Sequence, residues 1–437
     1  MLRGINKAQQ GDARRLLQCL TVAARPLRVE ELAELLAFDF QATSERGIPT
    51  LKEDWRWNDQ EDAVLSTCSS LIAIVRNGDS RVVQFSHFSV KEYLTSPRLA
   101  QSHGDVSRFH IDLNAAHTIL AQACLGTLLR LDEHTNSTGS KGLPLAAYAA
   151  QHWVEHARFE GVSSRVRDGM DDLFDSSKPH FAAWLQVHDM DERWGQFSRR
   201  RDSVGSPVYY AALCGFYDLA ECLIMKHPEQ VNAGGGHILA PLPAALSKRH
   251  FTVANLLHKH GAVVDVRDES KWTPLYAASV LGHVDIMRWL LNHGANANAQ
   301  TSGCMTPLYR AVQHTQLEAV QVMLEHNPDI NSRDNDGETP LHFAVSYIDF
   351  SSKGKEVEVV QRLLEHGADP NMRYRDSTPL HKASSKGSLE VARLLLSHGA
   401  KVDEKDGDGR TPFQVASSKE YHEMTKLLLE HGAVPPP

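Results

Sequence analysis

Histidine and cysteine are the residues of this chain whose types could bind a metal or act as nucleophiles. The sequence contains 24 histidines and six cysteines, at positions 19, 68, 124, 214, 222 and 304. The cysteines show no Cys-x-x-Cys spacing and are not grouped with histidines as metal ligands are. Many histidines instead recur in two motifs, Thr-Pro-Leu-His and His-Gly-Ala, about 33 residues apart. That spacing does not bring ligands to one point, so we expect no metal site and no disulfide framework.

Nucleotide and acyl-transfer chemistry also have recognisable motifs. A phosphate-binding loop, Gly-x-x-x-x-Gly-Lys-Ser/Thr, is absent from the sequence. The single Gly-Lys pair, Gly354-Lys355, is followed by Glu356 and is expected in a surface loop. Gly-x-Ser-x-Gly and His-Glu-x-x-His, typical of hydrolases and zinc proteases, do not occur either. The sequence therefore predicts a protein that is not an enzyme and uses no cofactor.

The prolines reveal an internal repeat. Short apolar helical segments begin at Pro207, 241, 274, 307, 340, 379 and 412. Four of them start with Thr-Pro-Leu, in which Thr accepts a backbone N–H as N-cap, Pro occupies the first helical position and Leu points into the core. A second helix follows about 16 residues later and ends at His-Gly-Ala, as at His398-Gly399-Ala400, where Gly suits the left-handed conformation.

A period near 33 with these motifs resembles the ankyrin repeat, and the resemblance covers residues 206–434 as seven units. One helix pair cannot bury its own apolar face, so the units must stack into an α-solenoid. The first two units depart from the motif, with Ser206-Pro207-Val208 and Ala240-Pro241-Leu242. About six extra residues between Ala344 and Val357 are expected to form a longer loop between two helices.

Residues 10–100 have a different pattern. Amphipathic helices are predicted at 12–24, 29–37 and 61–71, followed by strands at 72–75 and 81–85 that flank Asn77-Gly78, a hairpin turn signal. Ser89 and Glu92 have the spacing of a capping box, which predicts a short helix that ends before Pro97. Three helices followed by a hairpin predict a winged-helix domain.

This order of elements resembles the winged-helix segment that follows the nucleotide-binding domain in fungal NACHT-type (STAND) signalling NTPases. The segments that carry the resemblance are 15–18, 25–27, 30–32 and above all 85–94, Phe-Ser-His-Phe-Ser-Val-Lys-Glu-Tyr-Leu. Residues 107–200 resemble the helical connector of that family, and 161–205 are expected to cap the first repeat. The resemblance implies that His87 would contact the β-phosphate of ADP if an NTPase domain were present. Without such a domain, we expect the local backbone to satisfy the hydrogen bonds of the His87 side chain.

Composition limits the partners. A net charge of -8 argues against phosphate neutralisation by a nucleic-acid binder, and Glu61–Leu71, the candidate reading helix, has no Lys or Arg. No apolar stretch reaches the 18 or so residues that a membrane span needs, and the N-terminus lacks a signal core. We expect reduced cysteines and a cytoplasmic location.

These observations predict a mainly α protein with non-catalytic recognition of a protein partner as its function, without nucleic acid, membrane or small-molecule substrate. The alternative is the sensor end of a nucleotide-switched NACHT-type NTPase whose NTPase domain is missing from this chain. The first predicted helix begins soon after Met1, which favours the alternative slightly.

Partner-binding residues are expected where repeat positions have no packing duty, on hairpin tips and on the concave face formed by the first helices. Aromatic residues and arginine dominate interface energetics. The tip candidates are Trp272, Met305, Tyr374, Arg375 and Arg410, and the first-helix candidates are Tyr276, Tyr309, His314 and Tyr347. For Tyr276 and Tyr309 an alternative remains open, namely that they replace the usual repeat histidine. For Trp272 we favour binding over packing on its neighbouring turn.

Overall fold

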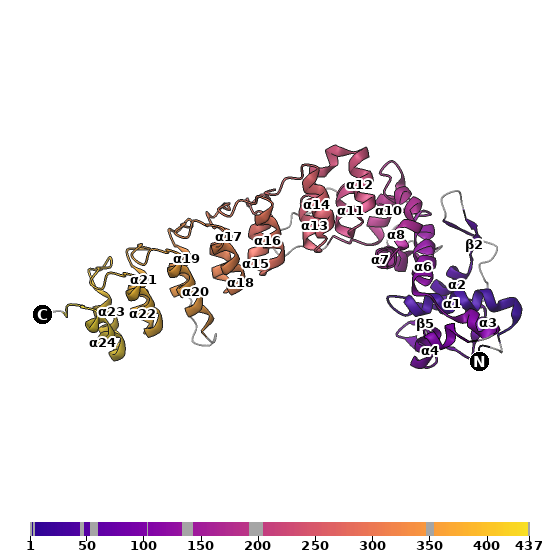
Figure 1. Cartoon of the computed structure of the whole chain (residues 1–437), viewed down its shortest axis with the longest axis horizontal. Helices are drawn as coiled ribbons and strands as arrows, with labels where there is room; N and C mark the ends of the chain where they lie inside the picture. Colours follow the sequence, from indigo (N-terminus) through magenta and orange to yellow (C-terminus); the bar gives the residue numbers. More distant parts are fainter. Residues whose placement is uncertain are drawn as a thin grey trace. The chain divides into compact units, whose positions relative to one another are not determined.

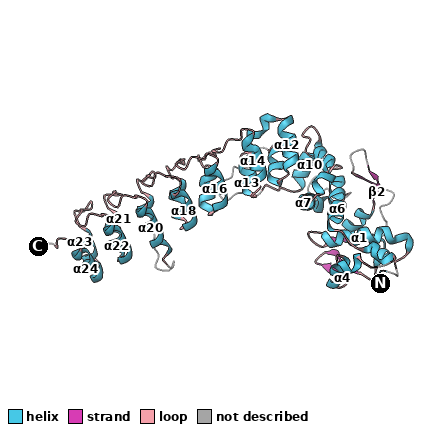
Figure 2. Ribbon diagram, viewed as in Figure 1, coloured by secondary structure: helices cyan, strands magenta, loops and turns pink. Residues whose placement is uncertain are grey.

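The computed structural model describes residues 2, 5–43, 48–52, 60–102, 104–132, 143–191, 204–346 and 354–435. The chain is mainly helical (Figures 1 and 2) and forms two compact units. The first unit comprises Met1–Glu192 and Ser206–Gln230, and the second comprises Arg193–Gly205 and Val231–Pro437.

The first unit begins with the predicted three helices and hairpin. Helices α1 (Gln10–Val22), α2 (Val29–Leu36) and α3 (Gln60–Cys68) precede strands β4 (Ile72–Asn77) and β5 (Ser80–Phe85). A short strand, β1 (Leu27–Arg28), pairs antiparallel with β5 and completes a sheet of order β1-β5-β4. Leu16, Leu17 and Leu32 are fully buried between the helices, as their helical spacing predicts.

Two features of this domain differ from the sequence prediction. Strands β2 (Phe38–Thr43) and β3 (Pro49–Leu51) form a second small sheet that was not predicted. Helix α4 (Phe88–Leu94) is capped by His87 rather than by Ser89, because the His87 ring Nδ1 accepts the Ser89 N–H at 3.2 Å. A capping box centred on Ser89 is therefore wrong, and the exposed His87 side chain is held by local contacts. The short helices α5 (Pro97–Ala100), η2 (Lys7–Gln9) and η4 (Asp105–Phe109) complete this part of the chain.

Further helices extend the first unit: α6 (Leu113–Leu128), α7 (Ala146–Ala157), α8 (Val162–Arg165), α9 (Arg167–Leu173), α10 (Pro179–Val187), α11 (Pro207–Cys214) and α12 (Tyr217–Lys226). An aromatic cluster joins α7, α9 and α10 to the α11–α12 pair. The Trp153 ring lies 5.4 Å from that of Phe216 and 5.5 Å from that of Trp184, and the Phe181 ring lies 5.6 Å from that of Tyr210. The described part of 161–205 thus covers the first repeat, as expected.

A buried hydrogen-bonded chain connects α1, α6 and α7. The Ala24 N–H donates to the Tyr148 hydroxyl at 3.1 Å, this hydroxyl lies 2.8 Å from His156 Nε2, and His156 Nδ1 lies 3.0 Å from His117 Nδ1. A consistent arrangement has Tyr148 donating to a neutral His156, which in turn donates to His117. Burial lowers the pKa of the fully buried His156 to about 3, and the neighbouring His117 adds to the effect.

We expect the stability of the first unit to fall on acidification because of His156. Below pH 6.5 the unfolded state binds a proton at this histidine, whereas the native state does not until about pH 3. The free energy of unfolding should therefore drop by about 1.4 kcal/mol per pH unit within that window from this residue. Urea denaturation of wild type and His156→Gln at several pH values measures the difference in slope. Equal slopes for the two proteins would contradict the assignment.

The second unit is a stack of helix pairs, each with a proline-started first helix and a longer or equal second helix (Figure 1). The pairs, after the short η6 (Pro228–Asn232), are α13 (Pro241–Ser247) with α14 (Phe251–Lys259), α15 (Pro274–Leu281) with α16 (Val284–Asn292), α17 (Pro307–Gln313) with α18 (Leu317–Leu324), α19 (Pro340–Ser346) with α20 (Lys355–Glu365), α21 (Pro379–Lys386) with α22 (Leu389–Ser397), and α23 (Pro412–Ser418) with α24 (His422–Glu430). The predicted long loop between α19 and α20 falls largely on 347–353, outside the described residues.

Thr caps start these helices as predicted. The hydroxyls of Thr273, Thr306 and Thr411 accept the backbone N–H three residues later at 3.2 to 3.4 Å. Ser206 does the same for α11, whereas Ala240 has no side chain with which to cap α13. The weaker sequence motifs of the first two units therefore still give helices.

Asparagine side chains connect consecutive units at the turns that follow the second helices. Asn371 accepts the Lys401 N–H at 2.8 Å and donates to the Gly399 carbonyl at 3.0 Å, and Asn331 bonds Asp369 and Gly367 in the same way. Each amide satisfies one donor and one acceptor in the turn of the next unit. These contacts fix the spacing between units.

Replacement of Asn371 by Ala should lower the free energy of unfolding by about 1 to 2 kcal/mol, because two hydrogen bonds between units are lost. Asn292→Ala, at an exposed position at the end of α16, is the matched control and should change stability by less than about 0.5 kcal/mol. Thermal or urea denaturation checks both values. A neutral Asn371→Ala variant would show that the amide contacts do not hold the units together.

Candidate functional site

The face of the second unit formed by the proline-started helices and by the hairpin tips that precede them is called here the first-helix face. A groove of about 530 Å³ opens on it between α19 and α21. Its walls come from both helices and from the tip before α21. The lining residues are Glu338, His342, Ser346, Tyr374, Arg375, Ser377, Thr378 and Lys382.

The floor of the groove is held by a buried histidine. His342 Nε2 lies 3.0 Å from the Met372 carbonyl in the next unit, so this nitrogen carries the proton, and Nδ1 accepts from the Thr339 hydroxyl at 2.7 Å. Burial lowers the pKa of His342 to about 4, which keeps the ring neutral at physiological pH. His381 repeats the arrangement one unit later, with Nε2 at 3.0 Å from the Arg410 carbonyl. Each of these histidines therefore connects its own first helix to the backbone of the next unit, at or just before that unit's tip.

The tip before α21 differs from its neighbours. Four residues, Tyr374–Ser377, close it through two backbone hydrogen bonds of 2.9 Å. The tips of other units span five residues, and their first residue, Asp268, Thr301, Asp334 or Asp406, accepts the N–H of the fifth through its side chain. Tyrosine cannot make that contact, so the Tyr374 side chain has no role in closing its own turn.

The two central residues of this short tip have left-handed backbone conformations, with φ +47° for Arg375 and +58° for Asp376. Glycine or asparagine usually occupies such positions in two-residue hairpins, because a Cβ atom makes the conformation costly. In the next tip the left-handed position is occupied by a glycine, Gly409, with φ +78°. Lys271 and Cys304 have φ +60° and +57° in the tips before α15 and α17, so the tip before α21 differs in having two such residues in succession.

Charge at the groove is distributed unevenly. The exposed Arg375 guanidinium lies 5.2 Å from the centre of the Tyr374 ring, within the range of a cation–π contact. Within the described residues neither Arg375 nor the exposed Lys382 has an ion pair, although the arginines beside them do. Arg373 pairs with Glu404 at 3.1 Å, and Arg410 pairs with Asp406 at 3.0 Å and with Asp408 at 2.7 Å.

The acidic residue of the groove lies deeper. Glu338 is half-buried, and its carboxylate lies 3.2 Å from the Tyr309 hydroxyl, which also lies 3.1 Å from the Asp334 carboxylate. Burial raises the pKa of Glu338, and the neighbouring Asp334 adds to this, while Lys382 and Arg375 act in the opposite direction. Glu338 is therefore half-buried and hydrogen-bonded, whereas the two positively charged side chains of the groove are exposed.

The structure brings Tyr374 and Arg375 of the predicted contact residues together in this groove. The Trp272 ring is half-buried, 4.7 Å from Tyr276, and the Arg310 guanidinium lies 5.7 Å from it. Met305 contacts the Tyr276 hydroxyl through its sulfur at 3.9 Å, and His314 is exposed at the end of α17. Arg410 is exposed but already paired, and Tyr347 lies outside the described residues.

Two of the predicted contact residues are corrected. Tyr276 and Tyr309 are only 1% and 3% exposed, so they are packing residues rather than direct contacts. They occupy the position of His342 in their own units, one turn after the capping threonine, which is the alternative left open from the sequence. Lys382 and Glu338 were missed. The shortened tip after His366 is the sequence signal that could have identified this groove.

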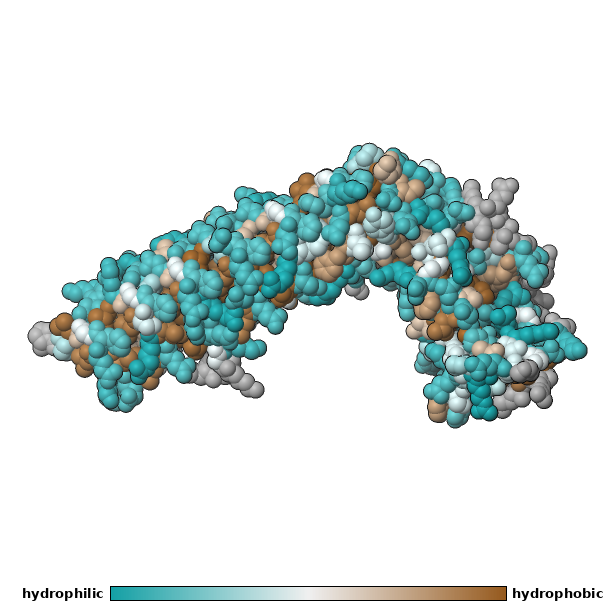
Figure 3. Space-filling view, viewed as in Figure 1, coloured by the Kyte–Doolittle hydropathy of each residue, from teal (hydrophilic) through white to brown (hydrophobic). Residues whose placement is uncertain are grey.

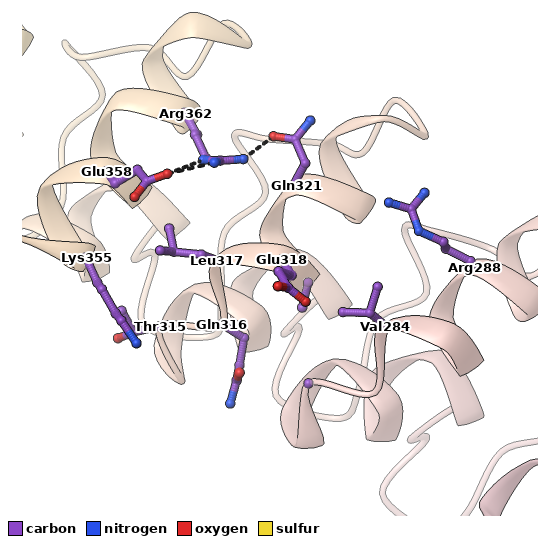
Figure 4. Close-up of a pocket in the computed structure, with 12 residues that line it drawn as sticks. Val284, Arg288, Thr315, Gln316, Leu317, Glu318, Gln321, Lys355, Glu358 and Arg362 are labelled. Atoms are coloured by element: carbon purple, nitrogen blue, oxygen red, sulfur yellow. Dashed lines mark hydrogen bonds and ion pairs between the residues drawn. The ribbon is translucent and has the colours of Figure 1, made fainter. Parts of the chain in front are cut away.

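A second groove, of about 590 Å³, lies along the second helices α16, α18 and α20 (Figure 4). Its arginines are paired: Arg362 donates to Glu358 at 2.7 Å and also contacts Gln321, and Arg288 bonds Glu325 at 3.0 Å. Lys355 is the first residue of α20, so it is helical rather than in a loop as predicted. In the space-filling view (Figure 3), hydrophilic residues cover most of the second unit, with apolar ones scattered among them.

Among the described residues, no three His, Cys, Asp or Glu side chains are close enough together to hold a metal ion. The described part of the chain likewise contains no helix that is both long and apolar enough to cross a membrane.

The stacked helix pairs, their Thr-Pro-Leu caps and the groove beside the hairpin tips define a repeat protein of the protein-interaction class. Residues 208–301, 299–374 and 348–436 match the family described as ankyrin repeats in three copies. Because these matches span more than half of the sequence, the chain belongs to the ankyrin-repeat family.

Residues 2–107 match a second family, described as the winged helix domain of GPI inositol-deacylase. The chain is also 32% identical over 290 residues to the azaphilone pigments biosynthesis cluster protein L of Monascus ruber. That match covers 60% of this chain and 58% of the relative, so it spans less than two thirds of the relative's length.

We expect Arg375→Gly to stabilise the fold, because glycine adopts φ +47° without the Cβ penalty. The free energy of unfolding should rise by about 0.5 to 1 kcal/mol. This is the cost of the left-handed conformation for arginine minus the larger conformational entropy that glycine loses on folding. Gly409→Ala, at φ +78° with open space around the added Cβ, is the reverse control and should destabilise by about 1 kcal/mol. Urea denaturation measures both. A destabilised Arg375→Gly variant would mean that the arginine supports the tip.

Proposed function

We propose that this protein recognises a protein partner through the groove between α19 and α21 and the hairpin tips on either side. The observation that carries the proposal is the Tyr374–Ser377 tip. It presents an aromatic ring and an arginine that the turn does not need, and it holds that arginine in an unfavourable backbone conformation. Strained residues that persist against a cost to stability indicate function.

The physical properties of the groove suit a peptide segment. Tyr374 offers a flat apolar surface with one polar atom, and Ser346, Ser377 and Lys382 supply donors along the walls. The floor is rigid, because buried threonine and histidine side chains fix it, so little conformational entropy is lost on binding. Trp272 and Met305, on the tips before α15 and α17, provide further contact area on the same face.

Random peptides displayed on phage and selected on the immobilised full chain test this function. Tyr374→Ala should weaken the selected peptides by about 1 to 3 kcal/mol, the loss typical of an interface aromatic. Tyr217→Ala removes an exposed tyrosine from the first unit and should leave the affinity unchanged. Calorimetry gives both dissociation constants. Equal affinity for wild type and Tyr374→Ala would place the binding surface elsewhere.

A second candidate function is favoured by the winged-helix match at residues 2–107. In this proposal the chain forms the regulatory end of a larger, nucleotide-switched NACHT-type signalling protein, in which His87 would contact the bound nucleotide. His87 is exposed, and its Nδ1 is engaged by Ser89, which leaves Nε2 available to a phosphate. A transcript of the same locus that also encodes a P-loop domain would support this candidate. Its absence from a full-length transcript survey would remove it.

A further inference from the structure

The arginines around the tip before α21 differ in whether they form an ion pair. Arg373 and Arg410 have carboxylate partners in their own or the next tip, at 3.1 and 3.0 Å. Arg375 and Lys382 have none within the described residues, and both line the groove from its two walls, the tip and helix α21. Two cations without an ion pair therefore line one groove, together with the Glu338 carboxylate, on which both of them act.

We propose that this groove binds an acidic side chain, Asp or Glu, of an extended peptide segment, with the carboxylate held between Arg375 and Lys382. The inference rests on the proposed function and specifies the chemistry of its partner. The guanidinium offers a planar fork that matches a carboxylate, and the ammonium adds a second point charge. Because both cations are exposed and unpaired, binding breaks no existing ion pair.

Glu338 does not prevent this binding. It is half-buried, and its carboxylate already contacts the Tyr309 hydroxyl at 3.2 Å, whereas Arg375 and Lys382 are exposed. Its remaining lone pairs are placed to accept a backbone N–H from the same segment. The groove thus presents two cations for the side chain, an acceptor for the backbone and the Tyr374 ring for contact area. A basic side chain would meet the cations first and be repelled.

The Arg375 backbone conformation is consistent with this role. Glycine at this position would relieve the left-handed strain but would remove the positive charge. Glycine occupies the left-handed position in the tips before α19 and α23, whereas Lys271 and Cys304 occupy it in the tips before α15 and α17. Arg375→Gly therefore separates the two effects, because it removes the proposed contact without weakening the fold.

The experiment uses a random peptide library on phage, displayed so that the C-terminus of each peptide is fused and only side chains supply carboxylates. The full chain, its Arg375→Gly and Arg375→Glu variants and Arg393→Glu are the targets. Arg393 is exposed on α22, away from the groove, and serves as the charge-matched control. Peptides selected on wild type should share an Asp or Glu position. Changing it to Asn or Gln should weaken binding about 10-fold, and Arg375→Gly should do the same without additive loss.

Reversal of charge gives the sharpest outcome. Arg375→Glu should reject the acidic peptides and recover binding when their acidic residue is changed to Lys, while Arg393→Glu behaves as wild type. Peptides that depend on Tyr374 but show no acidic position and no response to Arg375→Glu would overturn the inference and leave the proposed function intact. Peptides indifferent to Tyr374→Ala, or no selected peptides at all, would overturn both.

Discussion

The buried threonine hydroxyl at the start of each first helix is the contact on which the rest of the second unit depends. Thr339 is 2% exposed, and its hydroxyl both accepts the His342 N–H at 3.3 Å and bonds the His342 ring. A cap at this residue decides where the helix begins and therefore which way the ring points. The ring then reaches the Met372 carbonyl of the next unit and fixes the tip that carries Tyr374. The cap of one helix thus helps to determine the spacing between two units.

The repeated buried positions hold the units together, and the tip before α21 departs from the repeat. Positions that recur, such as Thr378 and His381, are buried and hydrogen-bonded to each other. Packing constrains these positions, whereas exposed positions are free to vary. The tip of Tyr374–Ser377 departs in length, in its first residue and in backbone conformation. Its first side chain is therefore not used to close the turn, unlike those of Asp334 and Asp406. The charges differ as well, because Arg410 of the tip before α23 pairs with Asp406, whereas Arg375 has no ion pair within the described residues.

Most of the fold follows from patterns of short range, and the parts that do not depend on contacts distant in sequence. Thr-Pro-Leu marked the helix starts because the cap is made within three residues. Strand β2 was not predicted, since its pairing with β3 is a tertiary contact with an irregular register. Tyr276 and Tyr309 were assigned to the surface because residue type alone does not reveal burial. Part of the groove was predicted: Tyr374 and Arg375 were identified by residue type and position, but Glu338 joins them only through the stacking of α19 on α21.

Amide hydrogen exchange of the full chain, with and without a selected peptide, tests most directly whether the groove between α19 and α21 is the binding surface. Amides that become protected on binding are found without any mutation, so the fold is not altered. The account predicts that added protection centres on the Tyr374–Ser377 tip and the first turns of α19 and α21. Protection confined to the second helices or to the first unit, with these segments unchanged, would contradict it.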